Sequence, residues 1–335
     1  MHRRSAWHSA AASAGIAGLA LLITTTGLAS VASAASTAAA AEAVPAWAYP
    51  VNPPGFKPAA DDGTPRRVPE SELRYTLSQV RDRFLAPDWH PAEHAPMPEV
   101  VARGRKPAVY ACGYCHRATG PGGPENASIA GLPEGYILRQ MADCRSGARQ
   151  SAVPHRAPVQ LKAAMAKEVT EAEVSEAARY FASLKPRANL RVIETDRAPT
   201  TTVAGWVHVA SSSGETEPLA GRIIEVPEDA EHFESRDARA RFIAYVPTGS
   251  VRQGATLAAG SRTPACSSCH GADLRGLGEV PSIAGRSPSY VMRQLVDMKL
   301  GLRAGAGAAP MKPVVEALSV EQMTALAAYL ATLRP

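Results

Sequence analysis

Large aromatic side chains are scarce in this sequence of 335 residues, in which phenylalanine, tryptophan and tyrosine together make up 5%. Hydrophobic residues still account for 45% and charged residues for 20%, which excludes a disordered polyelectrolyte. A foldable chain with so few large side chains has either small domains or domains whose centres are filled by something other than side chains. The length is typical of two domains, or three.

Runs of like charge are also missing. The formal net charge is +5, and the basic residues are spread along the chain without a cluster of five or six. This pattern gives little support to a nucleic-acid ligand. Beyond the N-terminus no apolar run approaches 18 residues, so we expect no transmembrane span in the mature chain.

The single long apolar stretch lies at the N-terminus. Two arginines precede the run from Ala10 to Val31, and Ala32-Ser33-Ala34 then offers a small-x-small cleavage site. This is the layout of a secretory signal peptide, which we place at residues 1–34. An uncleaved membrane anchor is the alternative, but three consecutive threonines interrupt the run. We expect the mature protein to be exported to the periplasm.

Cysteine is equally sparse, and four of the five cysteines fall in two identical patterns. Each pattern reads C-x-x-C-H: Cys112, Cys115 and His116, then Cys266, Cys269 and His270. This spacing is typical of covalent haem c attachment. Two thiols three residues apart reach the two vinyl groups of one porphyrin, and the next histidine can bind the iron. The alternatives are a redox disulfide, which would need a βαβ context, and zinc half-sites, which leave the histidines unexplained.

The sequence around these motifs is duplicated. A shift of 154 residues superposes 112–149 on 266–303 without a gap, and 16 of the 38 positions are identical. The repeated positions include Tyr136 and Tyr290, and Arg149 and Arg303. We therefore predict two copies of one domain, each with one covalently bound haem c.

Two helices are predicted in each copy. Capping boxes mark the start of helices over 170–184, with Thr170 and Glu173, and over 319–333, with Ser319 and Gln322. Another helix in each copy begins near Pro133 or Ser287 and ends near Gly147 or Gly301.

These motifs resemble the class I c-type cytochromes, and their tandem order resembles the diheme electron-transfer cytochromes c. The resemblance covers residues 99–186 and 250–335. It implies a mainly α fold of two tandem class I cytochrome c domains joined by a small β-containing segment. It also implies that His116 and His270 are proximal iron ligands, and that the carbonyl of Pro281 accepts the imidazole N–H of His270. The first copy has Ala127 at that position.

The resemblance implies a methionine as the sixth iron ligand, and here the two copies differ. Met311 lies eight residues before Ser319, where the family has its methionine. The equivalent position in the first copy is Lys162, with Met165 three residues later and His155 upstream. Met165 is the conventional choice, while Lys162, His155 and an open site stay as alternatives.

Several other residues are given two interpretations. Tyr136, Tyr290, Arg139 and Arg293 would lie near the porphyrin or its propionates, or else take part in surface or interdomain packing. Cys144 is read as a small buried side chain, with a reactive thiol or an intermolecular disulfide as the alternative.

The remaining segments complete a division into five parts. Residues 190–248 contain short β-rich runs at 190–195, 201–209, 221–226 and 242–246. Before the first copy, a helix is expected from Glu70 to Phe84. We divide the chain into a signal peptide (1–34), a proline-rich arm (35–98), a first cytochrome c domain (99–187, the first copy), a β-rich linker segment (188–249) and a second cytochrome c domain (250–335, the second copy).

The expected function is electron transfer by an exported diheme cytochrome c, without enzyme activity of its own. Its partners would be redox proteins: a periplasmic dehydrogenase, an oxidase or another cytochrome. The alternative is a haem enzyme such as a diheme peroxidase, which would need an open sixth position at the first haem.

Overall fold

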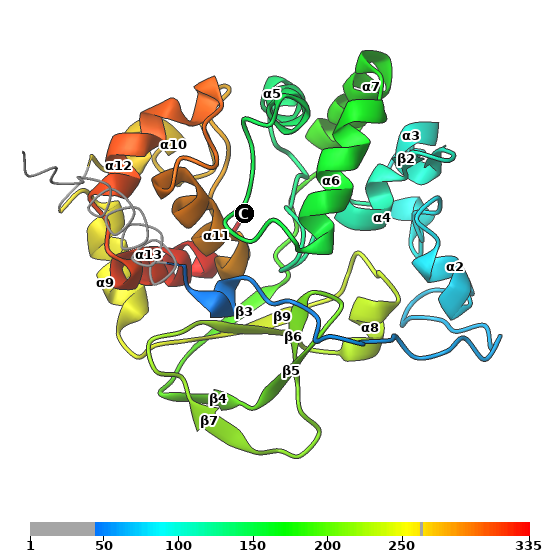
Figure 1. Ribbon diagram of the computed structural model, residues 1–335, viewed down its shortest axis with the longest axis horizontal. Coiled ribbons are helices and arrows are strands. Elements are labelled where there is room, and N and C mark those ends of the chain that lie inside the picture. Colours follow the sequence, from blue (N-terminus) through cyan, green and yellow to red (C-terminus); the bar gives the residue numbers. More distant parts are fainter. Residues whose placement is uncertain (1–43, 262–263) are drawn as a thin grey trace, which may run out of the picture. The chain divides into compact units, whose positions relative to one another are not determined.

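Helices carry both copies of the repeat in the computed structural model, which describes residues 44–261 and 264–335 (Figure 1). The predicted signal peptide lies outside these residues. The first copy contains α3 (Glu99–Ala102), β1 (Gly104–Arg105), β2 (Val109–Tyr110), α4 (Cys112–His116), α5 (Glu134–Ser146), α6 (Ala157–Glu168) and α7 (Glu171–Ser183). The second copy contains α9 (Ser250–Ala258), α10 (Ser267–His270), α11 (Pro288–Lys299), η3 (Ala306–Met311), α12 (Lys312–Glu316) and α13 (Val320–Thr332).

Both predicted capping boxes are confirmed. Thr170 accepts from the backbone N–H of Glu173, and Ser319 accepts from that of Gln322. The returning side chains complete each box, which satisfies two helix N–H groups that would otherwise lack partners. The sequence therefore fixes where α7 and α13 begin, to the residue.

The linker segment supplies most of the strands: β3 (Leu190–Glu194), β4 (Arg197–Pro199), β5 (Thr201–Ala204), β6 (Val207–Ala210), β7 (Thr216–Pro218), β8 (Ile224–Pro227) and β9 (Phe242–Val246), with α8 (Ala230–Glu234) before β9. β9 is the centre of a three-stranded sheet, parallel to β3 and antiparallel to β8. The other strands form the ribbons β5–β6 and β4–β7. About 39% of the described residues are helical, so together with these strands the described part of the chain is helical with a substantial β part.

Two of the predicted elements are wrong in extent. The helix expected over Glu70–Phe84 is only α2 (Leu77–Arg81), because Thr76 and Gln79 form a capping box and Glu70 has a positive φ of 59°. The single run expected over 201–209 is a hairpin, because Gly205 and Trp206, both with positive φ, turn the chain between β5 and β6.

The arm also contains η1 (Ala46–Ala48) and η2 (Pro91–Glu93). Its start belongs to the core of the second copy: Ala48 and Tyr49 pack with Met292, Leu326 and other residues of α11 and α13. Ala244 and Val246 of β9 join the same core. The first copy has a separate core that combines α3, α5, α6 and α7.

Helices α9 and α13 approach each other very closely. A Cβ placed on Gly254 would lie 2.0 Å from the carbonyl oxygen of Ala325, so only glycine fits at this crossing. In the described part of the chain no single helix is long and apolar enough to cross a membrane. Only the sharply bent pair Ala306–Glu316 and Val320–Thr332 meets that length and composition together, and most of α13 is buried.

Candidate haem sites

The two histidines of the C-x-x-C-H motifs are held in the same way. Nδ1 of His116 lies 2.8 Å from the carbonyl oxygen of Ala127, and Nδ1 of His270 lies 2.8 Å from that of Pro281. A carbonyl can only accept, so each Nδ1 carries the proton and each Nε2 has its lone pair free. The contact expected at Pro281 is confirmed, and Ala127 supplies the same carbonyl without the proline ring.

Burial keeps the imidazoles neutral, which iron ligation requires. Desolvation, followed by the nearby Lys162 ammonium, lowers the pKa of His116 to about 3. Burial also lowers the pKa of His270. Each histidine is thus a neutral donor with one free nitrogen.

A cavity lies beside the first motif and contains all the side chains that a haem c would need. Cys112, Cys115 and His116 line it together with Met165. The apolar part of the lining consists of Ile129, Leu132, Ile137, Met141, Val159, Leu161, Val169, Val174, Ala177 and Phe181. A flat apolar ring with two thioether links fits this lining. Such a ring would fill the centre of a domain that has few aromatic side chains.

Two of the three candidates for the sixth ligand of the first site, Met165 and Lys162, lie on α6. Met165 is 8% exposed and packs in the core of the first copy, and Lys162, one helical turn earlier, lines the same cavity. His155 is exposed and is not part of the lining. The loop before α7 is five residues longer than its counterpart in the second copy. These residues form part of the regular helix α6, which places a methionine at the cavity.

The polar part of the cavity has more positive than negative charge. Arg149, Arg156, Lys162 and Arg293 line it, against the carboxylates of Glu125 and Asp297. Glu125 is already paired with the buried Arg117, at 3.3 Å. Burial, and then the neighbouring Arg293 guanidinium, lower the pKa of Arg156 to about 9. This surplus of cations suits the two propionates of a haem.

Arginines also join the two copies reciprocally. Nη2 of Arg149 lies 2.9 Å from the Tyr290 hydroxyl, and Nη2 of Arg303 lies 2.9 Å from the Tyr136 hydroxyl. Arg303 also donates to Gln140, and its buried Nε has no partner among the described residues. Two backbone hydrogen bonds lie beside these contacts. The N–H of residue 150 donates to the carbonyl of residue 302, and the N–H of residue 304 donates to the carbonyl of residue 148. Tyr136 and Tyr290 therefore take part in the packing between the copies, and both also line the first cavity.

The equivalent arginines Arg139 and Arg293 have different environments. Arg139 is exposed and pairs with Glu279 of the second copy at 3.1 Å. Arg293 is buried and donates to the carbonyl of Ala48 in the arm at 2.8 Å. Of the two interpretations given to this pair, packing between segments applies to both arginines, whereas only Arg293 also lines the first cavity and is covered by the arm.

Arg156 is the functional residue that sequence reasoning missed. It is 1% exposed and donates to the carbonyls of Pro50 and Trp206, at 3.0 and 3.1 Å. It ties the arm and the linker segment to the cavity wall. Arg156 lies just outside the gapless repeat, so no sequence signal pointed to it.

The second site has the same attachment residues, of which His270 is buried and Cys269 is exposed. Cys266 and Met311 pack against the core of the second copy. Met311 ends η3 and precedes α12, where Lys312 donates to the carbonyl of Lys299 at 3.0 Å. Cys144, in the first copy, is 8% exposed and lines the first cavity, as expected for a small apolar side chain.

Comparison with known proteins agrees with this geometry. The cytochrome c family model matches residues 251–334. Cytochrome c-554(548) of Halomonas halodenitrificans is 37% identical over 65 residues, which cover 19% of this chain and 78% of that protein. The chain is a diheme class I c-type cytochrome. The cytochrome carries two covalently bound haem c groups and belongs to a family of electron-transfer proteins.

Longer matches extend across more of the cytochrome. The thiosulfate dehydrogenase electron acceptor of Thiomonas intermedia is 29% identical over 228 residues, 67% of this chain and 79% of that protein. The solved thiosulfate dehydrogenase TsdBA of Marichromatium purpuratum is 24% identical with a TM-score of 0.46. That match covers 77% of this cytochrome, which spans about 40% of the solved chain.

Proposed function

We propose that this protein is an exported, periplasmic electron carrier with one haem in each copy. Cys112 and Cys115 would hold the first haem with His116 as proximal ligand. Cys266, Cys269 and His270 would do the same for the second. The observation that carries this proposal is the shared setting of the two histidines, each with Nδ1 bonded to a carbonyl and Nε2 free.

The sixth ligands in this proposal are Met165 and Met311. Met165 is supported by its place in the lining of the first cavity, among apolar side chains that exclude water. Thioether ligation favours the reduced iron and raises the potential. A methionine in the lining of the first cavity also argues against the open position that a peroxidase would need.

The chain's own residues prepare the sites for electron transfer. Haem iron, when bound, supplies the one-electron chemistry. The carbonyls of Ala127 and Pro281 fix the orientation and tautomer of the two imidazoles. The arginines at the junction of the copies offset carboxylate charge and hold the copies in one arrangement, so the two sites stay at a fixed separation.

The partner that the relatives suggest is a periplasmic dehydrogenase. A similar protein is named as the electron acceptor of thiosulfate dehydrogenase, so that enzyme is the first donor to test. Two haems allow one chain to take up two electrons.

The test is a reductive titration of the purified haem-loaded protein, followed by mixing with a thiosulfate dehydrogenase and thiosulfate. We expect two electrons per chain, low-spin spectra for both haems, and rapid reduction by the enzyme. Binding of carbon monoxide by the reduced wild-type protein, together with peroxide turnover, would overturn the carrier function in favour of the peroxidase. Uptake of two electrons without reduction by the enzyme would exclude only this donor.

A further inference from the structure

The two haem-attachment motifs differ in how much of them reaches solvent. In the first motif Gly113 and Tyr114 are buried and Cys115 is half-buried. In the second motif Ser268 and Cys269 are exposed. Because the sequence spacing is the same in both motifs, this difference comes from the segments packed outside them.

The first motif is covered by the arm and the linker segment together. Arg236 of the linker segment lies over Tyr114, with its Cζ 3.7 Å from the ring centroid and Nη2 2.7 Å from the hydroxyl. Its Nε donates to the carbonyl of Val80 in the arm at 2.9 Å. Ala86 and Met97 of the arm pack in the same cluster as Cys115.

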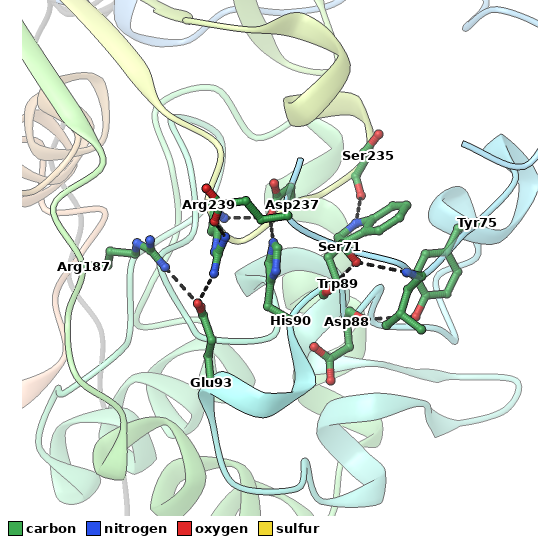
Figure 2. Close-up of polar contacts among 12 residues, drawn as sticks. Ser71, Tyr75, Asp88, Trp89, His90, Glu93, Arg187, Ser235, Asp237 and Arg239 are labelled. Atoms are coloured by element: carbon green, nitrogen blue, oxygen red, sulfur yellow. Dashed lines mark hydrogen bonds and ion pairs between the residues drawn. The ribbon is translucent and has the colours of Figure 1, made fainter. Parts of the chain in front are cut away.

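A second set of contacts fixes this cover in place, as Figure 2 shows. Nε1 of Trp89 donates to the carbonyl of Ser235 at 2.8 Å, and Nε2 of His90 lies 3.5 Å from a carboxylate oxygen of Asp237. Arg239 pairs with Glu93 of the arm. Trp89, His90 and Asp237 are buried, so the two segments form one interlocked layer over the first motif.

The second motif borders a shallow groove instead. Small side chains of α9, Ala255 and Ala258, line it with Ser267 and Tyr329. Leu277, on the loop between His270 and Pro281, is 63% exposed and is the most exposed large apolar residue of the described chain. We call this surface, with Arg275 and Arg334 at its edge, the second-site face.

The charge at the second-site face is mainly positive. Arg275 and Arg334 are both exposed and line the groove. The one carboxylate of the lining, Asp273, lies 3.7 Å from Arg275, which offsets it. An apolar centre with a cationic rim complements a protein surface that carries carboxylates around an apolar centre.

We propose that this cytochrome exchanges electrons with its partners through the second-site face, and that the first haem receives and donates its electron only through the second haem. The partner is an electron-transfer protein with an acidic docking surface. This inference rests on the proposed carrier function. It gives the arm and the linker segment a role: they close the first site to outside partners, so that one chain stores two electrons behind a single contact surface.

The experiment uses the fully reduced, haem-loaded protein and hexacyanoferrate(III), an anionic oxidant. Two hexacyanoferrate(III) ions take two electrons per chain, one from each iron, and stopped-flow absorbance follows both. The double variant Arg275→Glu/Arg334→Glu should slow both phases about tenfold, the lower end of what focused surface charge contributes. The cationic oxidant tris(phenanthroline)cobalt(III) should react faster with this variant than with wild type.

The matched control is Arg67→Glu/Arg74→Glu, which makes the same change in net charge on the exposed arm. It should change the hexacyanoferrate rates less than about twofold, since these positions lie away from the second-site face. Equal slowing by both pairs, or a first-haem phase unaffected by the Arg275/Arg334 pair, would overturn the proposal. Failure of either haem to give up its electron to any oxidant would instead refute the carrier function.

Discussion

The two copies share the attachment motif and the setting of its histidine, and differ in the ligand loop and in the segments packed outside the motif. In the first copy a regular helix, α6, carries the candidate ligand, and the arm and linker segment cover the attachment residues. In the second copy the candidate ligand ends a short 3-10 turn, and the attachment residues border the surface. The duplication therefore preserved the chemistry of attachment, while the flanking segments gave each site its own environment.

Removing the attachment thiols of one copy should remove one haem and leave the other. The double variants Cys112→Ala/Cys115→Ala and Cys266→Ala/Cys269→Ala should each bind one covalent haem per chain, because no thioether can form at the altered site. A pyridine haemochrome assay measures the ratio. The control Cys144→Ala should keep two haems, and a value of two in either double variant would contradict the assignment.

Replacing each candidate methionine should affect the two sites differently, because a different group is available in each copy to take the vacant sixth position on the iron. Met311→Ala and Met165→Ala should each lower one midpoint potential by about 0.2 V, a part of the roughly 0.8 V over which axial ligands tune haem. Lys162 lines the first cavity, so the first site of Met165→Ala should stay low-spin at alkaline pH. Lys312 is bonded to the Lys299 carbonyl, so Met311→Ala should bind carbon monoxide when reduced.

Redox titration and optical spectra report both effects. The variant Met165→Ala/Lys162→Ala is the control, and it should bind carbon monoxide at the first site too. Unchanged potentials in both single variants would remove the methionines from the ligand sets.

The arginines between the copies should tune both sites together. Arg149→Gln removes a cation that lines the first cavity and bonds to Tyr290 of the second copy. Loss of positive charge favours the oxidised iron, so we expect a fall of about 60 mV, a tenfold change for a one-electron couple. Arg139→Gln, at the exposed counterpart position, should shift the potentials much less. Equal shifts would show that the interface does not act on the sites.

The cover of the first copy should make its stability depend on pH. The hydrogen bond that Nε2 of His94 donates to the Asp88 carboxylate raises the pKa of His94, and the Tyr180 hydroxyl lies 3.0 Å from Nδ1. A raised pKa means that the folded state favours the imidazolium. The stabilisation is therefore complete below the unfolded pKa of about 6.5 and is lost as pH rises through the folded value.

Urea unfolding at pH 6 and pH 8.5 measures this effect. We expect wild type to lose about 1 kcal/mol more than His94→Gln across that interval, the scale of a charged hydrogen bond. An equal loss of unfolding free energy in the two proteins would show that His94 does not cause the pH dependence.

Loss of a helix N-cap should lower the free energy of unfolding by a similar amount in the two copies. Thr170→Ala and Ser319→Ala each remove a side chain that accepts from the third helical N–H. Each should cost about 1 kcal/mol in urea unfolding, the usual value for a lost cap. A cost confined to one copy would show that its helix is held by packing alone.

Short sequence patterns predicted those helices and strands whose formation depends on residues close together in the sequence. The capping boxes placed α7 and α13, and the β-rich run at 242–246 correctly predicted strand β9. The helix over 70–84 was overextended because its first half pairs elsewhere: Tyr75 bonds across to Arg66. Arg156 could not be found, because its partners, Pro50 and Trp206, are distant in sequence and are recognised only through their carbonyls. The motif predicted the attachment chemistry, but the cover over the first site depends on contacts between segments more than 100 residues apart.

The parallel pairing of β3 with β9 has a consequence for how this chain was assembled and how it can be redesigned. Leu190 opens β3 as the chain leaves the first copy, and Phe242 opens β9, which leads into the second. The N–H of Phe242 donates to the carbonyl of Asn189 at 2.8 Å, so the excursion between them starts and finishes at one place. The excursion is nevertheless anchored in the second copy, because β3 and β8 flank β9 and Ile223 packs in that copy's core. A redesign that keeps β3, β8 and β9 but replaces Arg236 would remove the contacts of the linker segment with Tyr114 and leave those of the arm in place.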